Sequence, residues 1–374
     1  MKQAFDGIKV ADFSWSVAGP IVTKCLADHG ADVVRIETAT HLDAIRSTRP
    51  YKDDVPGMNR AGFYAAYNDN KYGISLNLRH PKAVEVAKRI AAWADIVAES
   101  YIPGTMERWG LGYDELRRIN PSVIMFSTSN QGQYGPHAHQ RGFGYHLTSI
   151  AGFVHLTGWQ DRGPTQISVA YTDIVSHHFA VSWLIAALDY RRRTGKGQHI
   201  DISQYEASLQ FISPLLLDFT VNNHVTGREG NRSEYAAPHG VYPCKGEERW
   251  CAIAVFTDLQ WASFCRVIGS PEWSKSDKFS TLPARKENED DLDRLISDWT
   301  INLTTEEVME MMQGGGIPSG VVSNCDDIYQ NRQLQDRRHF VPLEHPEIGR
   351  YNFESPPFVL SKTPAEISTP KYSA

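Results

Sequence analysis

The sequence lacks the features of membrane, metal-binding and disulfide-rich proteins. Its 374 residues include five cysteines, which form no Cys-x-x-Cys pair and no spacing typical of metal ligands. No run approaches the roughly 18 consecutive apolar residues of a transmembrane helix, and the first residues lack the long apolar segment of a secretory signal. We therefore expect a cytoplasmic protein with reduced thiols, no metal site and no membrane association.

The sequence also has no large excess of positive or negative charge. The 38 Lys and Arg residues and 44 Asp and Glu residues give a formal net charge of −6, so the composition indicates no nucleic-acid partner. The basic run at 191–193 is typical of the last turn of a helix. An anionic ligand would need a local basic site.

Nucleotide-binding signatures are also absent. The segment SVAGP at 16–20, after the first predicted strand, holds one glycine and not the Gly-x-Gly-x-x-Gly pattern. A P-loop pattern is missing too. We therefore do not expect an NAD-linked dehydrogenase, although this turn can still present backbone N–H groups to an anionic ligand.

The first 200 residues alternate between strand and helix patterns. Strands are predicted at 8–14, 31–37, 95–101 and 122–129, and helices at 20–30 and 81–94. Strands separated by helices predict βαβ units, a parallel sheet and the α/β fold class. Because ligands of such sheets bind beyond the carboxyl ends of the strands, we expect one rim to gather the segments 14–20, 37–41, 99–104 and 127–135.

The second half of the chain has a different pattern. An apolar helix is predicted at 204–221, and a turn-rich stretch follows it. A strand at 249–255 and helices at 258–269 and 290–300 predict a smaller α+β domain. The Pro-rich tail shows little periodicity, so we expect it to wrap over another surface. The predicted division is a large domain at 1–225, a small domain at 226–330 and a C-terminal segment at 331–374.

One carboxylate lies where a strand-like run gives way to a long predicted helix. Asp173 is part of SVAYTDI at 168–174. Aspartate is a common helix N-cap, because its oxygens accept N–H groups of the first turn. Asp173 and His177 also have a spacing that can bind metal, but no third ligand is in evidence. The local sequence leaves a structural and a catalytic role open.

Eight segments spread along the chain carry a more specific signal. In order they are DFSWSVAGP, GADVVRIE, NDNKYGISLNLRHP, ESYIPGTMERWGLGYDELRRINP, TDIVSHHFAVSWLIAALDYRRRTGKGQHIDISQYEA, APHGVYPCKG, GIPSGVV and HPEIGRYNFESPPFVLSKTP. Together they span about residues 5–365 and resemble the family III CoA-transferases, which include formyl-CoA transferase and carnitine CoA-transferase. The order of motifs is most similar to that of carnitine- and benzylsuccinate-type enzymes.

The resemblance implies a fold and a reaction. The fold is an interlocked dimer whose subunits each have a Rossmann-like large domain that binds CoA, a small domain and a C-terminal segment returning to the large one. We expect a homodimer, or a heteromer with a related chain. The substrates are an acyl-CoA thioester and a carboxylic acid, with no tightly bound cofactor. Asp173 matches the catalytic aspartate, which forms a mixed anhydride and then an aspartyl-CoA thioester.

The resemblance also implies a CoA pocket. By position it comprises Val17, Ala18, Thr38, Leu76, Asn77, Leu78, Arg79, Ser100, Tyr101, Ile102, Arg108, Arg141, Gly142, Phe143 and Gly144. Three of these, Arg79, Arg108 and Arg141, are the natural partners of the CoA phosphates, and the alternative for each is a solvated surface charge. Tyr101 either stacks on adenine or is part of the core. A substrate loop is implied at Ala237, Pro238, His239 and Gly240.

Several positions depart from the family pattern. Thr38 replaces a nucleotide-contacting arginine, and either Arg46 or Arg49 compensates or the contact is lost. Gly144 replaces a common acidic residue after an aromatic one, and His177 replaces a usual glycine. YAAPHG replaces the glycine-rich substrate loop of formyl-CoA transferase. These changes predict an acceptor acid bulkier than formate or oxalate, either aromatic or dicarboxylic.

Two other functions remain open beside CoA transfer. One is α-methylacyl-CoA racemisation on the same fold, and the other is a role as one subunit of a heteromeric CoA-transferase. Racemisation needs a proton carrier on each face of the α-carbon, and the racemases of this fold use an aspartate and a histidine. Phe143 stands at the position of that histidine and cannot carry a proton, which favours the transferase.

Overall fold

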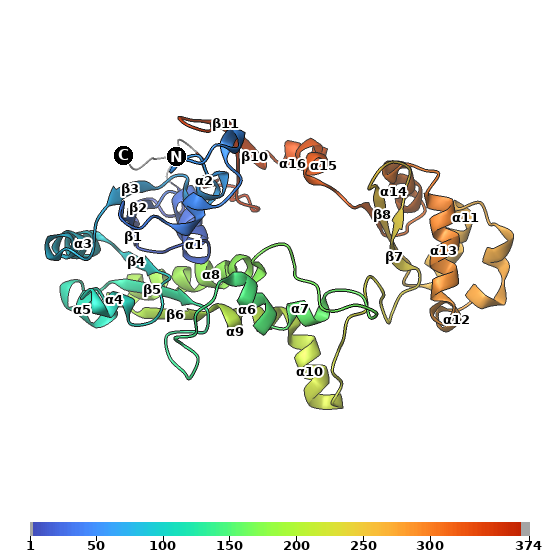
Figure 1. Ribbon diagram of the computed structural model, residues 1–374, viewed down its shortest axis with the longest axis horizontal. Coiled ribbons are helices and arrows are strands. Elements are labelled where there is room, and N and C mark those ends of the chain that lie inside the picture. Colours follow the sequence, from blue (N-terminus) through green and yellow to red (C-terminus); the bar gives the residue numbers. More distant parts are fainter. Residues whose placement is uncertain (1–2, 368–374) are drawn as a thin grey trace. The chain divides into compact units, whose positions relative to one another are not determined.

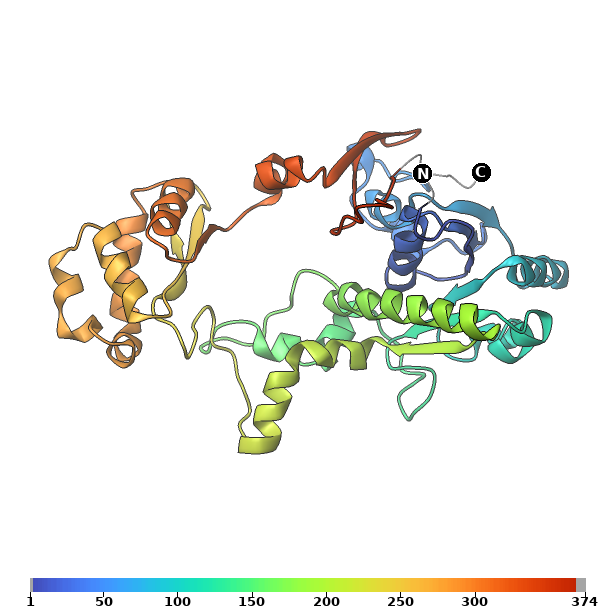
Figure 2. The same cartoon turned by 180° about the vertical axis from the view of Figure 1, so that it is seen from behind.

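The computed structural model describes residues 3–367. The chain forms two compact units, whose elements are drawn from opposite sides in Figures 1 and 2. The first unit takes the chain up to Val154, Gln166–Thr226 and the chain from Gln333 onward. The second takes His155–Thr165 and Gly227–Arg332. Each unit has a hydrophobic core of its own.

The first unit is built on a six-stranded parallel sheet with the order β3-β2-β1-β4-β5-β6. The strands are β1 (Lys9–Asp12), β2 (Asp32–Glu37), β3 (Tyr72–Ser75), β4 (Ile96–Glu99), β5 (Ile124–Ser129) and β6 (His199–Ser203). The predicted α/β class with a parallel sheet is confirmed. The strand order reverses between β1 and β4, and open parallel sheets bind ligands at such a switch point.

Helices cover both faces of this sheet (Figure 1). On one face α1 (Ala18–Asp28) and α8 (Tyr171–Thr194) share a core with the strands. On the other face α3 (Pro81–Trp93) and α5 (Tyr113–Ile119) form a second cluster. Because both faces are covered, β4 and β5 are buried at every position, which explains their continuous apolar sequences.

The shorter helices before residue 223 connect and cap these layers. They are η1 (Ala44–Ser47), η2 (Lys52–Asp54), α2 (Gly62–Asn68), α4 (Thr105–Arg108), α6 (Gly144–Ile150), α7 (Phe153–Leu156), α9 (Gln204–Leu209), η3 (Gln210–Ile212) and α10 (Ser213–Asn222). The helix predicted at 204–221 is therefore broken. Pro214 lacks the N–H that a continuous helix needs, and it lies instead in the first turn of α10.

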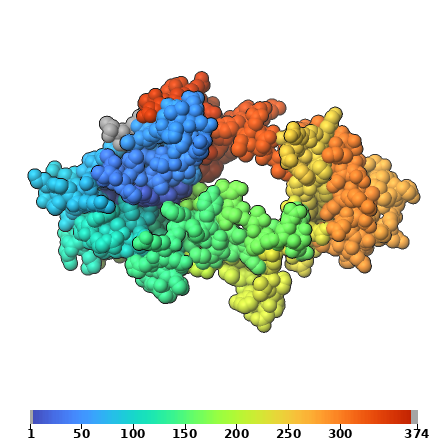
Figure 3. Space-filling view, viewed as in Figure 1, coloured from blue at the N-terminus to red at the C-terminus, as the bar shows by residue number. Residues whose placement is uncertain are grey.

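The C-terminal segment contains regular structure that its weak sequence periodicity did not predict. After α16 (Arg332–Asp336), strands β10 (Phe340–His345) and β11 (Gly349–Glu354) pair as an antiparallel hairpin. Phe353 of this hairpin packs with Ala65 of α2 in a small apolar cluster. Figure 3 shows the segment in red against the blue N-terminal part of the same unit.

The second unit has an α+β arrangement. Strands β7 (His239–Pro243), β8 (Trp250–Ala254) and β9 (Ser319–Val321) form an antiparallel sheet. Its helices are α11 (Asp258–Val267), η4 (Glu272–Lys275), η5 (Asp277–Phe279), α12 (Leu282–Glu287), α13 (Glu289–Thr300), α14 (Thr305–Gly314) and α15 (Cys325–Gln330). Along residues 3–367, no helix has both the length and the apolar character needed to cross a membrane.

Candidate active site

A cavity of about 580 Å³ lies in the first unit at the carboxyl ends of the strands. All six strands contribute to its wall, either with their last residues or with the residues that follow them. The sheet topology, and not one local motif, therefore builds the cavity, as the βαβ pattern predicts. The side chain of Asp173 lines it as well.

Asp173 lies in the first turn of α8 and does not cap the helix. The N-cap position belongs to Ala170, which makes no side-chain capping bond, so the N-cap interpretation of Asp173 was wrong. Its carboxylate is partly buried, and Oδ1 accepts a hydrogen bond from Nε2 of Gln204 at 3.1 Å. A first-turn carboxylate is still favoured as an anion by the helix dipole.

Burial sets the acidity of this carboxyl group. Loss of solvent raises the pKa of Asp173 to about 6, against the opposing effect of the hydrogen bond from Gln204. The group is therefore mainly ionised at neutral pH, yet it is less well solvated than a surface carboxylate. This combination is what a carboxylate nucleophile needs.

Gly144 at the start of α6 is in close contact with Asp173. A Cβ at this position would lie 2.5 Å from Cβ of Ala170 and 2.7 Å from Oδ2 of Asp173. Real Cβ atoms do not approach other atoms so closely. The glycine that replaces the acidic residue of relatives is therefore a steric requirement of this particular site.

The cavity brings together most of the residues that the family resemblance implied. These are Val17, Ala18, Thr38, Leu76, Asn77, Leu78, Arg79, Ser100, Tyr101, Ile102, Arg141, Gly142, Phe143, Gly144 and Asp173. They come from distant parts of the sequence, so their convergence is a property of the fold. Their contact with CoA stays a prediction.

Arg108 is absent from the residues that line this cavity. It is exposed at the end of α4, and its Nη2 donates to Oγ1 of Thr105 at 2.7 Å. Thr105 does line the cavity. Arg108 therefore contacts a residue of the wall without being part of the wall itself.

The predicted substrate loop at 237–240 belongs to the second unit. Ala237 is fully buried there, and its carbonyl accepts a bond of 2.8 Å from Nε of Arg285. The ring of His239 donates through Nδ1 to the carbonyl of Asn231 at 2.6 Å. Gly240 leaves no room for a Cβ, which would lie 2.8 Å from the hydroxyl of Tyr242.

Two arginines were considered as replacements for the nucleotide-contacting arginine that is missing at position 38. Both form bonds with other residues of the chain. Arg46 is buried, and its guanidinium donates to Glu37 at 2.8 Å and to Asn59 at 2.8 Å. Arg49 is exposed and pairs with Asp54 at 2.5 Å. Neither arginine lines the cavity.

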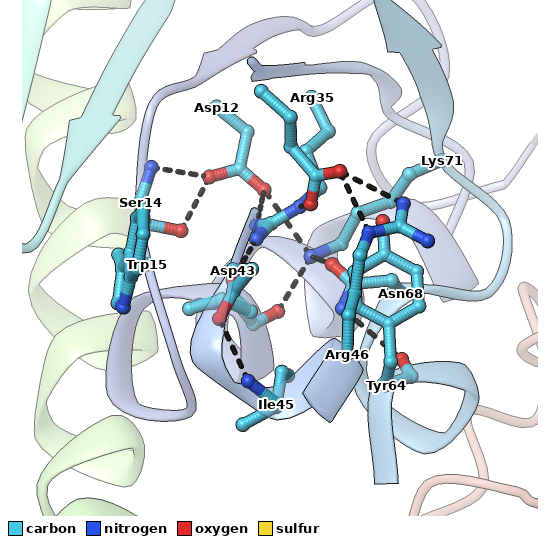
Figure 4. Close-up of polar contacts among 12 residues, drawn as sticks. Asp12, Ser14, Trp15, Arg35, Asp43, Ile45, Arg46, Tyr64, Asn68 and Lys71 are labelled. Carbon is cyan, nitrogen blue, oxygen red and sulfur yellow. Dashed lines mark hydrogen bonds and ion pairs between the residues drawn. The ribbon is translucent and has the colours of Figure 1, made fainter. Parts of the chain in front are cut away.

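A buried charge network, of which Arg35 and Asp43 line the cavity, was not predicted (Figure 4). Asp12 accepts the backbone N–H of Ser14 at 3.0 Å and the ammonium of Lys71 at 3.2 Å. Arg35 lies between Asp12, at 3.6 Å, and Asp43, which it contacts directly. All four ionised side chains are buried, so each charge depends on its partners.

This network fixes the loop that forms one wall of the cavity. The carboxylate of Asp43 accepts the backbone N–H of Ser16 at 3.1 Å. Ser16 has a φ of +61°, a left-handed conformation that costs a non-glycine residue free energy. Ser100 also accepts the N–H of Trp15 at 2.7 Å. Strands β1, β2 and β4 therefore hold the loop in one conformation.

The cavity also has an aromatic wall, of which only Tyr101 was predicted. The rings of Trp15 and His41 stack with centroids 5.0 Å apart, and both residues line the cavity. Tyr101 packs edge-on against Trp109 at 5.2 Å on the same lining. Flat apolar surfaces of this kind suit an adenine base or an apolar acyl chain.

The histidines near Asp173 lie outside this lining. His177 packs on His178 with ring centroids 3.8 Å apart, and burial lowers its pKa to about 4, helped by the charge of His178. His146 lines a separate hollow of about 260 Å³. Within residues 3–367, no three His, Cys, Asp or Glu side chains are placed to hold a metal ion.

Comparison with known proteins gives consistent results along the whole chain. The sequence profile of CoA-transferase family III matches residues 5–372. Succinyl-CoA–D-citramalate CoA-transferase of Chloroflexus aurantiacus is 30% identical, and the matched region covers 97% of this chain and 89% of that protein. Succinyl-CoA:glutarate CoA-transferase of Mus musculus is 28% identical over 96% of this chain and 80% of its own. A CAIB/BAIF family protein from Brucella suis has a TM-score of 0.91 at 27% identity and covers 100% of this chain and 97% of its own.

Proposed function

The chain belongs to CoA-transferase family III, and we propose that it moves CoA from an acyl-CoA thioester to a free carboxylic acid through covalent intermediates on Asp173. One observation carries the proposal. Asp173 is a partly buried carboxylate with a raised pKa in the wall of the cavity at the switch point of the sheet. Perturbed carboxyl groups in such cavities are favoured sites of catalysis.

In the proposed reaction Asp173 is the nucleophile of the first step and the leaving group of the last, and its carboxyl carbon is attacked in the two steps between them. The carboxylate attacks the thioester carbonyl, and the C–S bond breaks to release CoA thiolate. The thiolate attacks the aspartyl carbon of the anhydride, which frees the donor acid and leaves CoA on Asp173. The acceptor carboxylate then attacks this thioester, and the thiolate returns to the acceptor's carbonyl carbon. Covalent catalysis divides one hard exchange into easier steps.

We propose that the cavity binds the CoA moiety. Arg79 and Arg141 in its wall, with Arg108 beside it, supply charge for the phosphates. The stacked pair of Trp15 and His41 offers an apolar face to the base or the acyl chain. With Arg46 and Arg49 engaged elsewhere, we infer that the arginine contact replaced by Thr38 is lost.

Replacing Arg108 by alanine is expected to weaken acyl-CoA binding by about 1.5–3 kcal/mol, the usual range for a hydrogen bond to a charged group. Calorimetric titration with CoA at two salt concentrations measures this, and added salt should narrow the difference because the contact is an ion pair. Arg192→Ala, at a surface pair with Asp189, is the control. An unchanged Kd in Arg108→Ala would mean that Arg108 only holds Thr105.

The acceptor is proposed to be a dicarboxylic acid bulkier than oxalate. The relatives named above act on citramalate and on glutarate with succinyl-CoA as the donor. A further relative, from Acetobacter aceti, is named for oxalate and is 31% identical over 85% of this chain. The aromatic wall suits the carbon chain of an acid bulkier than oxalate.

A panel of acids read by mass spectrometry tests the proposed function. Succinyl-CoA is incubated with glutarate, malate, citramalate, benzylsuccinate, oxalate or formate, and new acyl-CoA products are identified. We expect exchange with the larger dicarboxylates and little with oxalate or formate. A parallel arm with a chiral 2-methylacyl-CoA in D2O tests for racemisation. Deuterium uptake at the α-carbon without an acceptor would replace the transferase proposal by a racemase.

We also propose that two copies assemble as an interlocked dimer. The family resemblance implies this arrangement, and helix α10 supports it, because no residue of the helix is buried within the chain. Leu217 is 62% exposed and Val221 is 70% exposed. Exposed apolar surface of this kind marks a protein interface. A second copy is the expected partner, with a related chain as the alternative.

Leu217→Glu is expected to leave the chain monomeric when the denatured protein is refolded at micromolar concentration, because interlocked subunits can associate only as they fold and a buried unpaired charge in an interface costs roughly 2 kcal/mol or more. Sedimentation velocity measures the change, and Asp218→Glu on the same helix is the control. A monomeric wild-type protein, or a Leu217→Glu variant that stays dimeric, would contradict the assignment of α10 to the interface.

A further inference from the structure

The two oxygens of Asp173 have different surroundings. Oδ1 accepts a hydrogen bond of 3.1 Å from Nε2 of Gln204. Oδ2 faces Gly144, where an added Cβ would lie only 2.7 Å away. One oxygen is therefore held by an amide donor, while the other borders a residue without a side chain. The two oxygens of the carboxylate, which are chemically equivalent in free aspartate, are therefore not equivalent in this site.

Gln204 is built into the fold as a fixed donor. It begins α9 directly after β6, and Ser203 caps this helix by accepting the N–H of Glu206. Its side chain is almost fully buried, with 3% exposure, and lines the same cavity as Asp173. A buried amide needs a hydrogen-bond partner, and Asp173 provides it.

From this geometry we infer that Gln204 is a catalytic residue that stabilises negative charge on Oδ1 of Asp173 during CoA transfer. The inference rests on the proposed function and names a further residue of the same site. Oδ2 is the attacking atom. It forms the bond to the acyl carbon, the C–S bond breaks, and its electron pair leaves on the sulfur of CoA.

The second step places charge on the oxygen that Gln204 holds. The thiolate adds to Cγ of Asp173, and the π electrons of the aspartyl carbonyl move onto Oδ1. The intermediate collapses when the Cγ–Oδ2 bond breaks, and the electron pair leaves with the donor acid, which keeps Oδ2. A donor 2.7–3.1 Å from a developing oxyanion lowers such barriers, and the observed distance of 3.1 Å lies at the edge of this range.

Gln204→Met tests the inference, because methionine keeps the volume and removes the amide donor. We expect kcat with succinyl-CoA and glutarate to fall about 100-fold, the usual loss for one oxyanion donor, with KM for succinyl-CoA within about twofold. We also expect the acid limb of the kcat profile to move to higher pH, because the bond from Gln204 lowers the pKa of Asp173. A purely structural role would not move that limb.

Two further variants keep the inference falsifiable. Gln204→Glu preserves the shape and adds a second carboxyl group beside Asp173, so its acid limb should lie higher still. Ser208→Ala disturbs the same helix without touching Asp173 and should leave both kcat and the limb unchanged. An acid limb in both Gln204 variants at the same pH as in the wild type, or a kcat loss as large in Ser208→Ala, would overturn the inference.

Covalent loading separates this inference from the proposed function. In the Gln204→Met variant, succinyl-CoA should still load Asp173, but more slowly, and the acyl group should accumulate before CoA does. Normal loading kinetics in this variant would overturn the role of Gln204 and leave the proposed function intact. A wild-type protein that never carries CoA on Asp173 would overturn both.

Discussion

Replacing Asp173 by asparagine is expected to abolish CoA transfer, with a loss in kcat of at least about 10⁴-fold, as for other nucleophile deletions. Only a carboxylate can form the anhydride and the thioester of the proposed mechanism. Asparagine has nearly the same shape, and its Oδ1 can accept the same hydrogen bond from Nε2 of Gln204, which measures 3.1 Å in the wild type. The turnover assay with succinyl-CoA measures the effect.

The same variant is expected to be more stable than the wild type at pH 7–8. The pKa of Asp173 is raised from 3.8 to about 6 in the folded protein, so the folded state disfavours the ionised form. The resulting cost is absent below about pH 4 and is fully present above about pH 6. Asparagine removes it, and we expect a gain of about 1–3 kcal/mol in unfolding free energy.

Thermal unfolding at two pH values checks this part of the prediction. The melting temperature of Asp173→Asn should exceed that of the wild type at pH 7.5, and the two should converge as the pH falls toward 4. Asp189→Asn, at an exposed pair on the same helix, is the control for helix α8. Near-normal transfer by Asp173→Asn would remove Asp173 from the mechanism.

Replacing Gly144 by alanine is expected to reduce kcat by roughly 100-fold, comparable to the loss of an active-site donor. The new Cβ would come within 2.7 Å of Oδ2 and 2.5 Å of Ala170, so either the carboxylate or the start of α8 must move. Displacing a nucleophile by a fraction of an ångström costs catalysis more than binding.

A comparison of kcat with the Kd for CoA tests the role of Gly144. The Kd should stay within a few-fold, because the clash is with Asp173 and not with the CoA phosphates. Gly163→Ala is a control, since a Cβ there meets nothing within 4 Å. A Gly144→Ala variant with wild-type kcat would show that the site adapts and that the close contact has no catalytic meaning.

The sequence predicted the central part of the sheet because buried strands have continuous apolar runs. It did not predict the edge strands β3 and β6, since an edge strand is covered less completely and its residues are mixed. The hairpin of β10 and β11 was missed for a related reason. Pro342 lies inside β10, and proline argues against a strand unless the strand is at an edge.

Residues of the site could be predicted from the sequence only where they belong to a motif of the family. Asp173 and Gly144 were found through the family resemblance, because no local pattern distinguishes a nucleophile from a cap. Gln204 could not be found, since its contact with Asp173 depends on how the end of β6 meets α8. The buried pair of Arg35 and Asp12 was missed because charged residues in strands are normally read as exposed.

The most direct test of the central claim is mass spectrometry of Asp173 after incubation with succinyl-CoA and no acceptor acid. The reaction is quenched in acid, the protein is digested, and the peptide that contains Asp173 is examined. The proposed mechanism predicts CoA linked to Asp173, removed by hydroxylamine and absent in Asp173→Asn. An unmodified Asp173 in a preparation that turns over succinyl-CoA and glutarate would contradict it.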